Sequence, residues 1–381
     1  MKICNKKKYV VGLSGGPDSI FLLDNLIKKV KKEKIIACHV NYNFRKDSNV
    51  DQKICEDYCK KNNIDLRTKV VDVSYDNLKQ NFEAWARELR YDFFVEVLKE
   101  NQFDKILIAH NMNDDIETYI MQVEKKILPK YYGLKKQTTY KNCIVYRPIL
   151  EFKKSEILEY LRRNNIHYAV DSTNLDIKYT RNKIRSTIDE NAFEEILIKK
   201  NVENKKINQY TNKINKLITE KITKKTLLNN TGEFNERFLF SYLENKGFGE
   251  LIYSRKKNFL KEILKQLKSE KSYVKIAIGN LLIIKDRENL YFENIKNMRI
   301  IDKNIFDLDE EEKRFFKLND LKGFEKDTFI TNNWEKYRSQ LIYKNKKLSD
   351  FYKKNKISYF DRFSTPIIYN KTSKNILNNL L

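Results

Sequence analysis

One short stretch near the start of the chain constrains its fold more than any other. An apolar run over residues 9–13 is followed by Ser14, Gly15, Gly16, Pro17, Asp18 and Ser19. Apolar side chains then recur at helical spacing over residues 20–27. The pattern predicts a buried strand, a turn in which Gly15 and Gly16 can take positive φ, and a helix with Pro17 in its first turn. Because first-turn N–H groups lack intrahelical partners, this order of elements predicts an anion-binding site.

Asp18 makes the expected anion more specific. A carboxylate beside phosphates repels them unless a cation lies between, so we expect residues 14–19 to bind ATP with Mg²⁺ and Asp18 to be a metal ligand. No lysine follows in the pattern G-x-x-x-x-G-K-S/T, so the stretch is not the P-loop of kinases and GTPases. A helix start capped by Ser or Asp, without any ligand, is the alternative.

Strand-like and helix-like stretches alternate through the first half of the chain. Strands are expected at residues 8–13, 34–42, 66–73, 105–110 and 143–149, and helices at 18–31, 49–61, 81–100 and 114–124. The alternation predicts an α/β fold with a parallel sheet covered by helices. Ligands of such folds bind outside the carboxyl ends of the strands, where polar clusters fall at residues 14–19, 41–48 and 110–117.

The second half shows a different pattern. A long helix with a basic face is expected within residues 192–225, with further helices at 235–244, 254–267 and 348–355. Residues 273–293 alternate like a hairpin, with turns at 279–280 and 285–289, and residues 307–313 form an acidic break. We therefore expect three domains, at residues 1–195, 196–295 and 296–381.

Composition narrows the class of partner. The net charge of +24 over 381 residues favours a polyanion such as RNA or DNA, although an A+T-rich genome would also enrich lysine. The five cysteines form no Cys-x-x-Cys pair, and their odd number without a signal peptide favours a reducing cytoplasm. No apolar run approaches the length of a membrane span.

Several ordered motifs resemble one known family. Residues 14–19 resemble the SGGxDS motif of the PP-loop ATP pyrophosphatases, and residues 38–45 (CHVNYNFR) resemble HVNHxLR. Residues 85–94 (WARELRYDFF) are similar to AREARYxFF, residues 109–118 (AHNMNDDIET) to AHHxDDQxET, and residues 147–150 (RPIL) to RPLL. Residues 171–185 resemble DPSN followed by TRNxIR, and residues 347–369 resemble the last domain of the same family. That family is tRNA(Ile)-lysidine synthetase.

The sequence departs from the family's motifs at several positions. Tyr42 and Asn111 stand where the family has histidines, so neither position is an imidazole acid or base here. Asn113 replaces an Asp, Asp115 replaces a Gln, and Ser172 replaces a Pro. Asp114 and Glu117 are the acids that still match.

Acidic candidates lie in the fourth motif. Asp114 and Glu117 are three residues apart, on one helix face, where they could hold Mg²⁺ or a substrate ammonium. A capping box without a ligand is the alternative for this Asp-x-x-Glu spacing. A satisfied structural histidine is the favoured interpretation of His39, whereas His110, which stands beside these acids, could equally be structural or functional.

Basic candidates lie in three further motifs. Arg87 and Arg90 share a helix face and could bind pyrophosphate oxygens, although a Glu83–Arg87 surface pair would also use one of them. Arg181 and Arg185, one turn apart, could contact a phosphate or the RNA backbone, or form a solvated face. By the resemblance, Arg45 is a further tRNA or phosphate contact.

The resemblance implies a PP-loop nucleotide-binding domain, a helical middle domain and a small α+β C-terminal domain. It implies a two-step ligation in which ATP adenylates C2 of the wobble cytidine of an isoleucine tRNA with a CAU anticodon, and L-lysine then displaces AMP. Asp18, Asp114, Glu117, Arg87 and Arg90 are the catalytic candidates, and a homodimer stays open. The rival classes are a PP-loop tRNA thiolation enzyme and a non-enzymatic RNA-binding protein with a degenerate loop.

Overall fold

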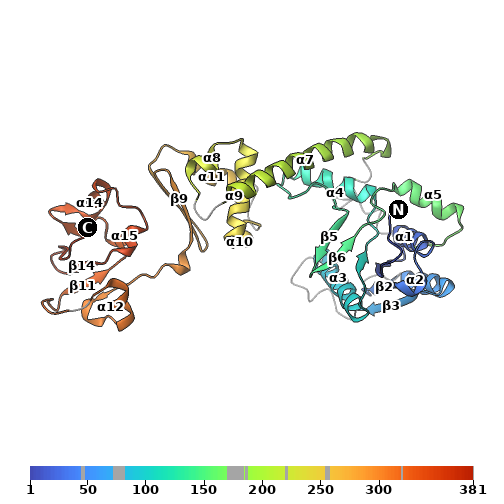
Figure 1. Ribbon diagram of the computed structural model, residues 1–381, viewed down its shortest axis with the longest axis horizontal. Helices are drawn as coiled ribbons and strands as arrows, with labels where there is room; N and C mark the ends of the chain where they lie inside the picture. Colours follow the sequence, from blue (N-terminus) through green and yellow to red (C-terminus); the bar gives the residue numbers. More distant parts are fainter. Residues whose placement is uncertain are drawn as a thin grey trace. The chain divides into compact units, whose positions relative to one another are not determined.

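The chain folds into two compact units, residues Met1–Gln209 and Tyr210–Leu381, in a computed structural model (Figure 1). The structure describes residues 1–43, 48–71, 82–169, 184, 188–218, 222–253, 258–318 and 321–380. The predicted division at residues 195 and 295 stays a prediction.

The first unit is built on a six-stranded sheet in the order β3-β2-β1-β4-β6-β5. Its strands are β1 (Tyr9–Gly12), β2 (Ile35–Asn41), β3 (Asp65–Val70), β4 (Lys105–Leu107), β5 (Gln137–Tyr140) and β6 (Cys143–Tyr146). All the pairings are parallel except that of β5 with β6. The predicted parallel sheet is therefore confirmed, whereas the antiparallel edge strand β5 was not predicted.

Helices cover both faces of this sheet. On one face lie α1 (Pro17–Ile27), α2 (Ser48–Asn62) and α5 (Lys154–Arg163), and on the other lies α3 (Phe82–Glu100). The other helices are α4 (Met112–Glu124) and α7 (Phe193–Leu217), and the last residues of α7 belong to the second unit. Alternate residues of β1 explain the two layers: Val11 packs with α1, α2 and α5, whereas Val10 packs with α3. Consecutive hydrophobic residues in the central strands follow from this double coverage.

The order of the strands determines where a ligand can bind. From β1 the chain first builds outward through β2 and β3, and it then returns to add β4 on the other side of β1. The connections after β1 and β4 therefore leave the sheet toward opposite sides. Parallel sheets bind ligands at such a switch point, outside the carboxyl ends of the strands. The predicted motifs at residues 14–19 and 110–117 follow β1 and β4 directly.

A polar cluster buried between α1, α2 and α5 ties these helices together. Burial alone would raise the pKa of Asp24, but the Lys28 ammonium and the hydroxyls of Tyr160 and Tyr58 all donate to it. Together they hold the pKa of Asp24 below its usual value. The cluster thus depends on the ionised carboxylate.

The second unit combines short helices with antiparallel sheets. Its helices are α8 (Lys224–Leu228), α9 (Gly232–Asn245), α10 (Gly249–Tyr253), α11 (Phe259–Lys268), α12 (Glu310–Phe316), α13 (Trp334–Tyr337), α14 (Leu348–Lys354) and α15 (Asp361–Ser364). One sheet contains β7 (Tyr273–Ile278), β8 (Leu281–Asp286) and β9 (Asn289–Asn294). A second contains β10 (Asp302–Asn304), β11 (Thr328–Thr331) and β14 (Ile367–Asn370), and a ribbon pairs β12 (Ile342–Tyr343) with β13 (Lys346–Lys347).

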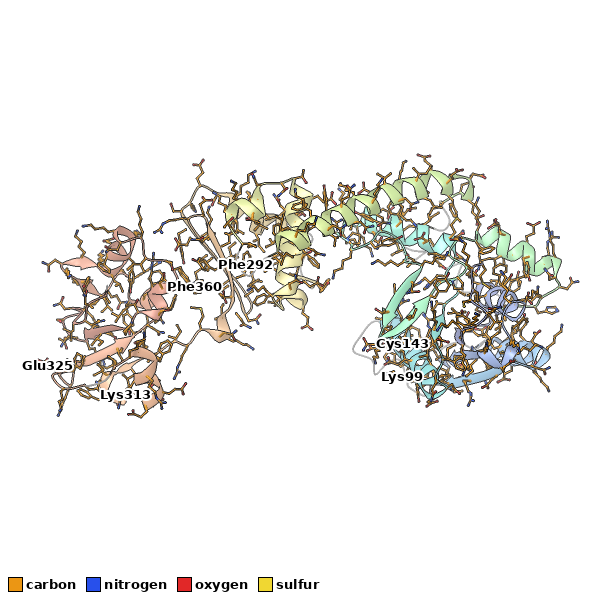
Figure 2. The ribbon with its side chains drawn as sticks, in the orientation of Figure 1. Lys99, Cys143, Phe292, Lys313, Glu325 and Phe360 are labelled. Carbon is orange, nitrogen blue, oxygen red and sulfur yellow. The ribbon has the colours of Figure 1, made fainter. Side chains whose placement is uncertain are left out.

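Two expectations for this unit can be compared directly. Residues 273–293 do form antiparallel strands with a turn at Gly279 and Asn280, as predicted. Phe292 of β9, which is labelled in Figure 2, packs on Tyr242 with ring centroids 5.0 Å apart. The break predicted at residues 307–313 is wrong. This stretch contains the start of α12, where Asp309 and Glu312 form a capping box.

In the part of the chain that the structure describes, no helix combines the length and apolar character needed to cross a membrane.

Candidate active site

The loop after β1 has the conformation of an anion site. Gly15 has φ +84°, and a Cβ there would lie 3.0 Å from the carbonyl oxygen of Asp51, so glycine is required on both counts. Gly16 has φ −71° and ψ 165°, so the second glycine does not use the positive φ that it was expected to allow. The carbonyl of Gly15 accepts a hydrogen bond of 2.9 Å from Ala169 N–H.

Within the described residues, the N-terminus of α1 carries no side-chain cap. Gly16 is the N-cap residue, Pro17 is the first helical residue as predicted, and no described side chain accepts from the first-turn N–H groups at this cap. The alternative interpretation, a helix start capped by Ser or Asp, is therefore wrong. Uncapped first-turn amides at the positive end of a helix favour a bound anion.

The two serines of the loop hold its shape. Ser19, only 3% exposed, accepts from Ser14 N–H at 3.1 Å and donates to the Gly16 carbonyl at 2.9 Å. The hydroxyls of Ser14 and Ser19 lie 3.2 Å apart. Ser19 thus fixes the turn from inside, whereas Ser14 is exposed beside it.

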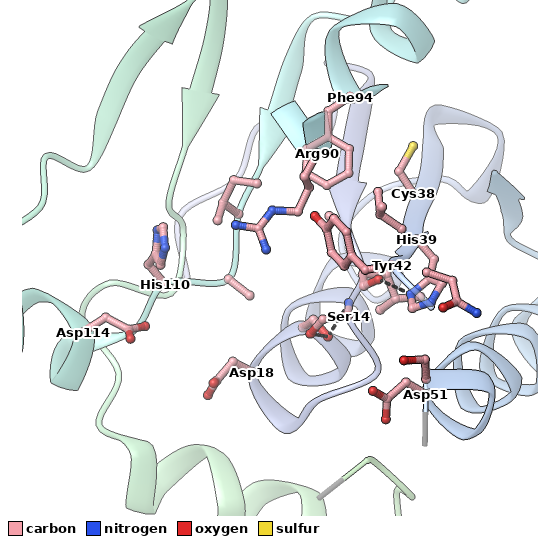
Figure 3. A pocket seen from close by; sticks show the side chains of 18 of the residues that line it. Ser14, Asp18, Cys38, His39, Tyr42, Asp51, Arg90, Phe94, His110 and Asp114 are labelled. Atoms are coloured by element: carbon pink, nitrogen blue, oxygen red, sulfur yellow. Dashed lines mark hydrogen bonds between the residues drawn. The ribbon is translucent and has the colours of Figure 1, made fainter. Parts of the chain in front are cut away.

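A first cavity of about 370 Å³ opens where β1, β2 and β4 end. Apolar side chains of Val40, Phe94 and Ile108 line one part of it, and Ser14, Asp18 and Asp114 line another. In the view of Figure 3 the Arg90 side chain extends into this cavity between His110 and Tyr42. A pocket that is part apolar and part charged suits a nucleotide.

A second cavity, of about 650 Å³, lies on the other side of the loop. Its lining includes Gly16 and Pro17 of the loop and three carboxylates, those of Asp18, Asp114 and Glu117. Ser14, Asp18 and Asp114 line both cavities. Two ligands bound in the two cavities would therefore meet at these residues.

Asp18 binds two donors from other elements. Lys154 Nζ lies 2.8 and 2.7 Å from its two carboxylate oxygens, and Asn111 Nδ2 lies 3.0 Å from Oδ1. Neither residue was a sequence candidate for this contact. One feature could have pointed to Lys154: it is the first residue of α5, where a positive side chain opposes the helix dipole and therefore needs a partner.

Asp114 does take part in a capping box, but with Asn111 as the N-cap residue and not with Glu117 as the sequence alternative had it. Its Oδ2 accepts from Asn111 N–H at 3.1 Å, and Asn111 Oδ1 accepts from Asp114 N–H at 3.0 Å. The same carboxylate lines both cavities, so capping does not remove it from the site. Glu117, 3% exposed, lines the second cavity one turn later on α4.

Asp115 faces away from the site into a buried ion pair. Its carboxylate pairs with Lys200 of α7, and the two side chains are 4% and 6% exposed. It also accepts from Leu134 N–H at 2.7 Å. A Cβ on Gly133, whose φ is +74°, would lie 2.2 Å from Asp115 Oδ1, so this loop requires glycine.

The structure separates the two arginine candidates of α3. Arg90 lines the first cavity, and its buried Nε has no hydrogen-bond partner among the residues that the structure describes. Arg87 is exposed, donates to Tyr91 Oη at 3.0 Å and stacks on that ring at 4.7 Å. The Glu83 side chain, the other partner considered for Arg87, lies outside the described residues, as do Arg45, Arg181 and Arg185.

Both histidines beside the loop are in hydrogen-bonded positions. His39 Nδ1 lies 3.0 Å from the Leu13 carbonyl, and burial lowers the pKa of His39. Arg147 Nε donates to His110 Nδ1 at 3.0 Å, which leaves the proton of a neutral His110 on Nε2. Tyr42 donates to the Ala86 carbonyl at 2.7 Å, and burial raises its pKa.

The oxygen donors fit a magnesium ion that is bound together with phosphates. Within the described ranges, no three His, Cys, Asp or Glu side chains form a metal cage. Mg²⁺ usually binds through one or two carboxylates together with substrate phosphates and water, so a complete protein cage is not needed. Asp18 already binds one cation, the Lys154 ammonium, beside the uncapped helix.

The fold and this site define a PP-loop domain, and the PP-loop domain family matches residues 1–192. A relative from Mycoplasma mycoides subsp. mycoides SC, named tRNA(Ile)-lysidine synthase, is 40% identical over 401 aligned residues, which cover 99% of this chain and 98% of the relative. One of the same name from Mesoplasma florum is 40% identical and covers 100% of this chain and 99% of its own length. A solved structure, the U34-tRNA thiolase NcsA from Methanococcus maripaludis, is 19% identical over 54% of this chain and 73% of that one, with a TM-score of 0.44. The chain belongs to the tRNA(Ile)-lysidine synthase family.

Proposed function

We propose that this protein ligates L-lysine to C2 of the wobble cytidine of an isoleucine tRNA with a CAU anticodon, and that ATP is converted to AMP and pyrophosphate. Family membership supports lysidine formation on this class of tRNA and an ATP-dependent reaction. The observation that carries the proposal is the meeting of two cavities at Asp18 and Asp114. The first cavity suits the base and ribose of the nucleotide, and its phosphates would lie at the helix start, where the two cavities meet. The part of the second cavity that is lined by Asp114 and Glu117 suits the lysine ammonium.

The first step adenylates the cytidine. The C2 oxygen of the base attacks the α-phosphorus of ATP, and the bond from that phosphorus to the oxygen of the pyrophosphate leaving group breaks. First-turn N–H groups of α1 and the Arg90 guanidinium supply donors for the charge on the phosphate oxygens. When bound, Mg²⁺ neutralises phosphate charge, and Asp18 is the residue that would hold it.

The second step uses the second cavity. The ε-amine of lysine attacks C2 of the adenylated cytidine, and the C2–O bond to AMP breaks. Asp114 and Glu117 are our candidates for holding the ε-ammonium before it loses its proton, since their carboxylates line this cavity. Arg87, which stacks on Tyr91 on an exposed surface, has the weaker structural case as a catalytic residue.

The net charge of +24 supports binding of tRNA mainly through its phosphates. Arg45, Arg181 and Arg185 remain predicted tRNA or phosphate contacts. The homodimer and the cytoplasmic location also stay predictions.

Sulfur transfer is less well supported. Cys38, Cys55 and Cys59 are buried, and burial raises the pKa of each thiol, which disfavours the reactive thiolate. Cys4 is exposed, but it lines neither of the two cavities. A non-enzymatic RNA-binding role leaves the uncapped helix and the glycine loop without a purpose.

The experiment measures tRNA-dependent pyrophosphate release and lysine incorporation for Asp114→Asn. Asparagine keeps an oxygen for the capping box but loses the charge that an ammonium needs. We expect adenylation to continue while the lysine concentration needed for half-maximal incorporation rises about 10-fold or more. Loss of both steps would instead make Asp114 a ligand of the nucleotide or its metal.

The matched control is Glu156→Gln. Glu156 accepts from Lys153 N–H at 2.7 Å in the capping box of α5, but it lies outside both cavities. The Glu156→Gln variant should leave both pyrophosphate release and lysine incorporation unchanged. If neither variant alters lysine kinetics, capping is the whole role of Asp114. A wild-type protein that incorporates no lysine would refute the proposed function itself.

A further inference from the structure

The Lys154 side chain occupies the place where a cation is expected. Its ammonium contacts both oxygens of Asp18, and the two side chains are 32% and 27% exposed. Lys154 also lines the second cavity together with Gly16 and Pro17, where the uncapped helix begins. An ammonium at this position lies beside the expected phosphates as well as on the carboxylate.

The backbone of Lys154 is held in place by its neighbours. Its N–H donates to Asn113 Oδ1 at 2.9 Å, and Asn113 Nδ2 donates to Glu190 at 2.9 Å. Glu190 also accepts from the Ser155 N–H at 3.3 Å and from the Ser155 hydroxyl. The start of α5 is therefore fixed, whereas the four-carbon side chain of Lys154 can still rotate.

The position of this lysine costs helix stability. Lys154 is the first residue of α5, where a positive charge is repelled by the helix dipole. Helix stability alone would favour an acidic or neutral residue there. The contact with Asp18 offsets that repulsion while no other cation is bound.

We propose that Lys154 is a phosphate ligand of the nucleotide, kept on Asp18 until a divalent cation replaces it on that carboxylate. Two cations cannot share one carboxylate without repelling each other, so arrival of Mg²⁺ releases the ammonium. The released ammonium then reaches the nucleotide phosphates at the adjoining helix start. The proposal rests on the proposed function only in that the ligand is a nucleoside triphosphate.

A lysine-acylation footprint on the unmodified protein tests the exchange. Mn²⁺ alone should increase the labelling of Lys154 because it frees the amine, and MgATP should decrease it below the level of the empty protein. Lys153, whose Nζ lies 3.2 Å from the Glu190 carbonyl, is the internal control and should not change. Labelling that is the same in all three states would overturn the proposal.

Binding to variants gives a second, independent readout. With the competing ammonium removed, Lys154→Met should bind Mn²⁺ alone several-fold more tightly, as measured by electron paramagnetic resonance. Its affinity for MgATP, measured by calorimetry without tRNA, should fall about 10- to 100-fold. Lys154→Arg should keep most of that affinity, and Lys153→Met should behave as wild type in both assays.

A permanent structural pair predicts a different result. In that case Lys154→Met would lower thermal stability but leave the affinity of the folded protein for MgATP unchanged. None of these measurements includes lysine or tRNA. The two proposals can therefore fail separately. If the wild type incorporates lysine normally but the labelling of Lys154 does not respond to Mn²⁺ or MgATP, only the proposal about Lys154 is refuted.

Discussion

Lys200→Met should destabilise the first unit more than any surface substitution in it. The change leaves the Asp115 carboxylate, 4% exposed, without its ammonium partner. Removal of one partner from a buried ion pair costs about 3–5 kcal/mol of unfolding free energy. The carboxylate retains one donor, Leu134 N–H at 2.7 Å, which places the expected loss near the lower end, at about 3 kcal/mol.

Calorimetric unfolding of the full chain is the assay. For a unit of about 200 residues, a loss of about 3 kcal/mol lowers the midpoint of its transition by roughly 6–12 °C. The double variant Asp115→Asn/Lys200→Met removes both charges and keeps an oxygen for Leu134 N–H. It should therefore recover most of the loss, and the double-mutant cycle gives the coupling energy of the pair.

The reasoning would be refuted by a loss below about 1 kcal/mol in Lys200→Met, since that value is typical of an exposed pair. It would also fail if the double variant were no more stable than the single one. The result bears on the choice of controls for Asp114 as well. Asp115→Asn removes a negative charge next to Asp114, but it also breaks this buried ion pair. It therefore cannot serve as a neutral control for Asp114→Asn.

Two further predictions concern the loop and the helix layer. Gly15→Ala should abolish ATP binding in a calorimetric titration, because Gly15 has φ +84° and the Asp51 carbonyl lies close to it. Gly16→Ala should lower the affinity for ATP far less, because its Cβ would come no nearer than 3.5 Å to Ser14 Oγ. Equal losses of affinity in the two variants would contradict this explanation. Asp24→Asn should cost about 2 kcal/mol of unfolding free energy at pH 7. Because the folded-state pKa of Asp24 is lowered, its contribution is full above the unfolded pKa of about 3.9 and is lost as the pH falls through the folded value. Denaturant titrations should therefore show the difference from wild type shrinking below about pH 4, and a difference that grows there would have the wrong sign.

The loop and the central sheet could be predicted because their signals are local. Residues 14–19 lie between an apolar run and a helical period, and the structure has β1 and α1 there. The carboxyl ends of β1 and β4 meet in the sheet, so the polar clusters that follow them also meet. Capping and ligand binding were both open for Asp114 because they require the same residue types. The capping partner was predicted wrongly, since Asn111 forms the box with Asp114 in place of Glu117.

The contacts that complete the site are not local. Lys154 lies 136 residues from Asp18, and Lys200 lies 85 residues from Asp115. No periodicity links positions so far apart. Helix α5 was not predicted although the sequence carries a signal for it, since Ile157 and Leu161 are buried one turn apart behind the Glu156 cap. A lysine at the start of that helix, against the dipole, was the local indication of a partner elsewhere.

The bond between Asn113 and Glu190 has an evolutionary consequence. Asn113 stands where the family motif has an aspartate, and its amide nitrogen donates to the Glu190 carboxylate at 2.9 Å. An aspartate at 113 would place two carboxylates in contact, so neither position can change alone without cost. The two positions should therefore covary among relatives: chains with an acidic residue at the first should carry a neutral or basic residue at the second. An alignment in which acids occur freely at both positions would show that the pair evolves independently.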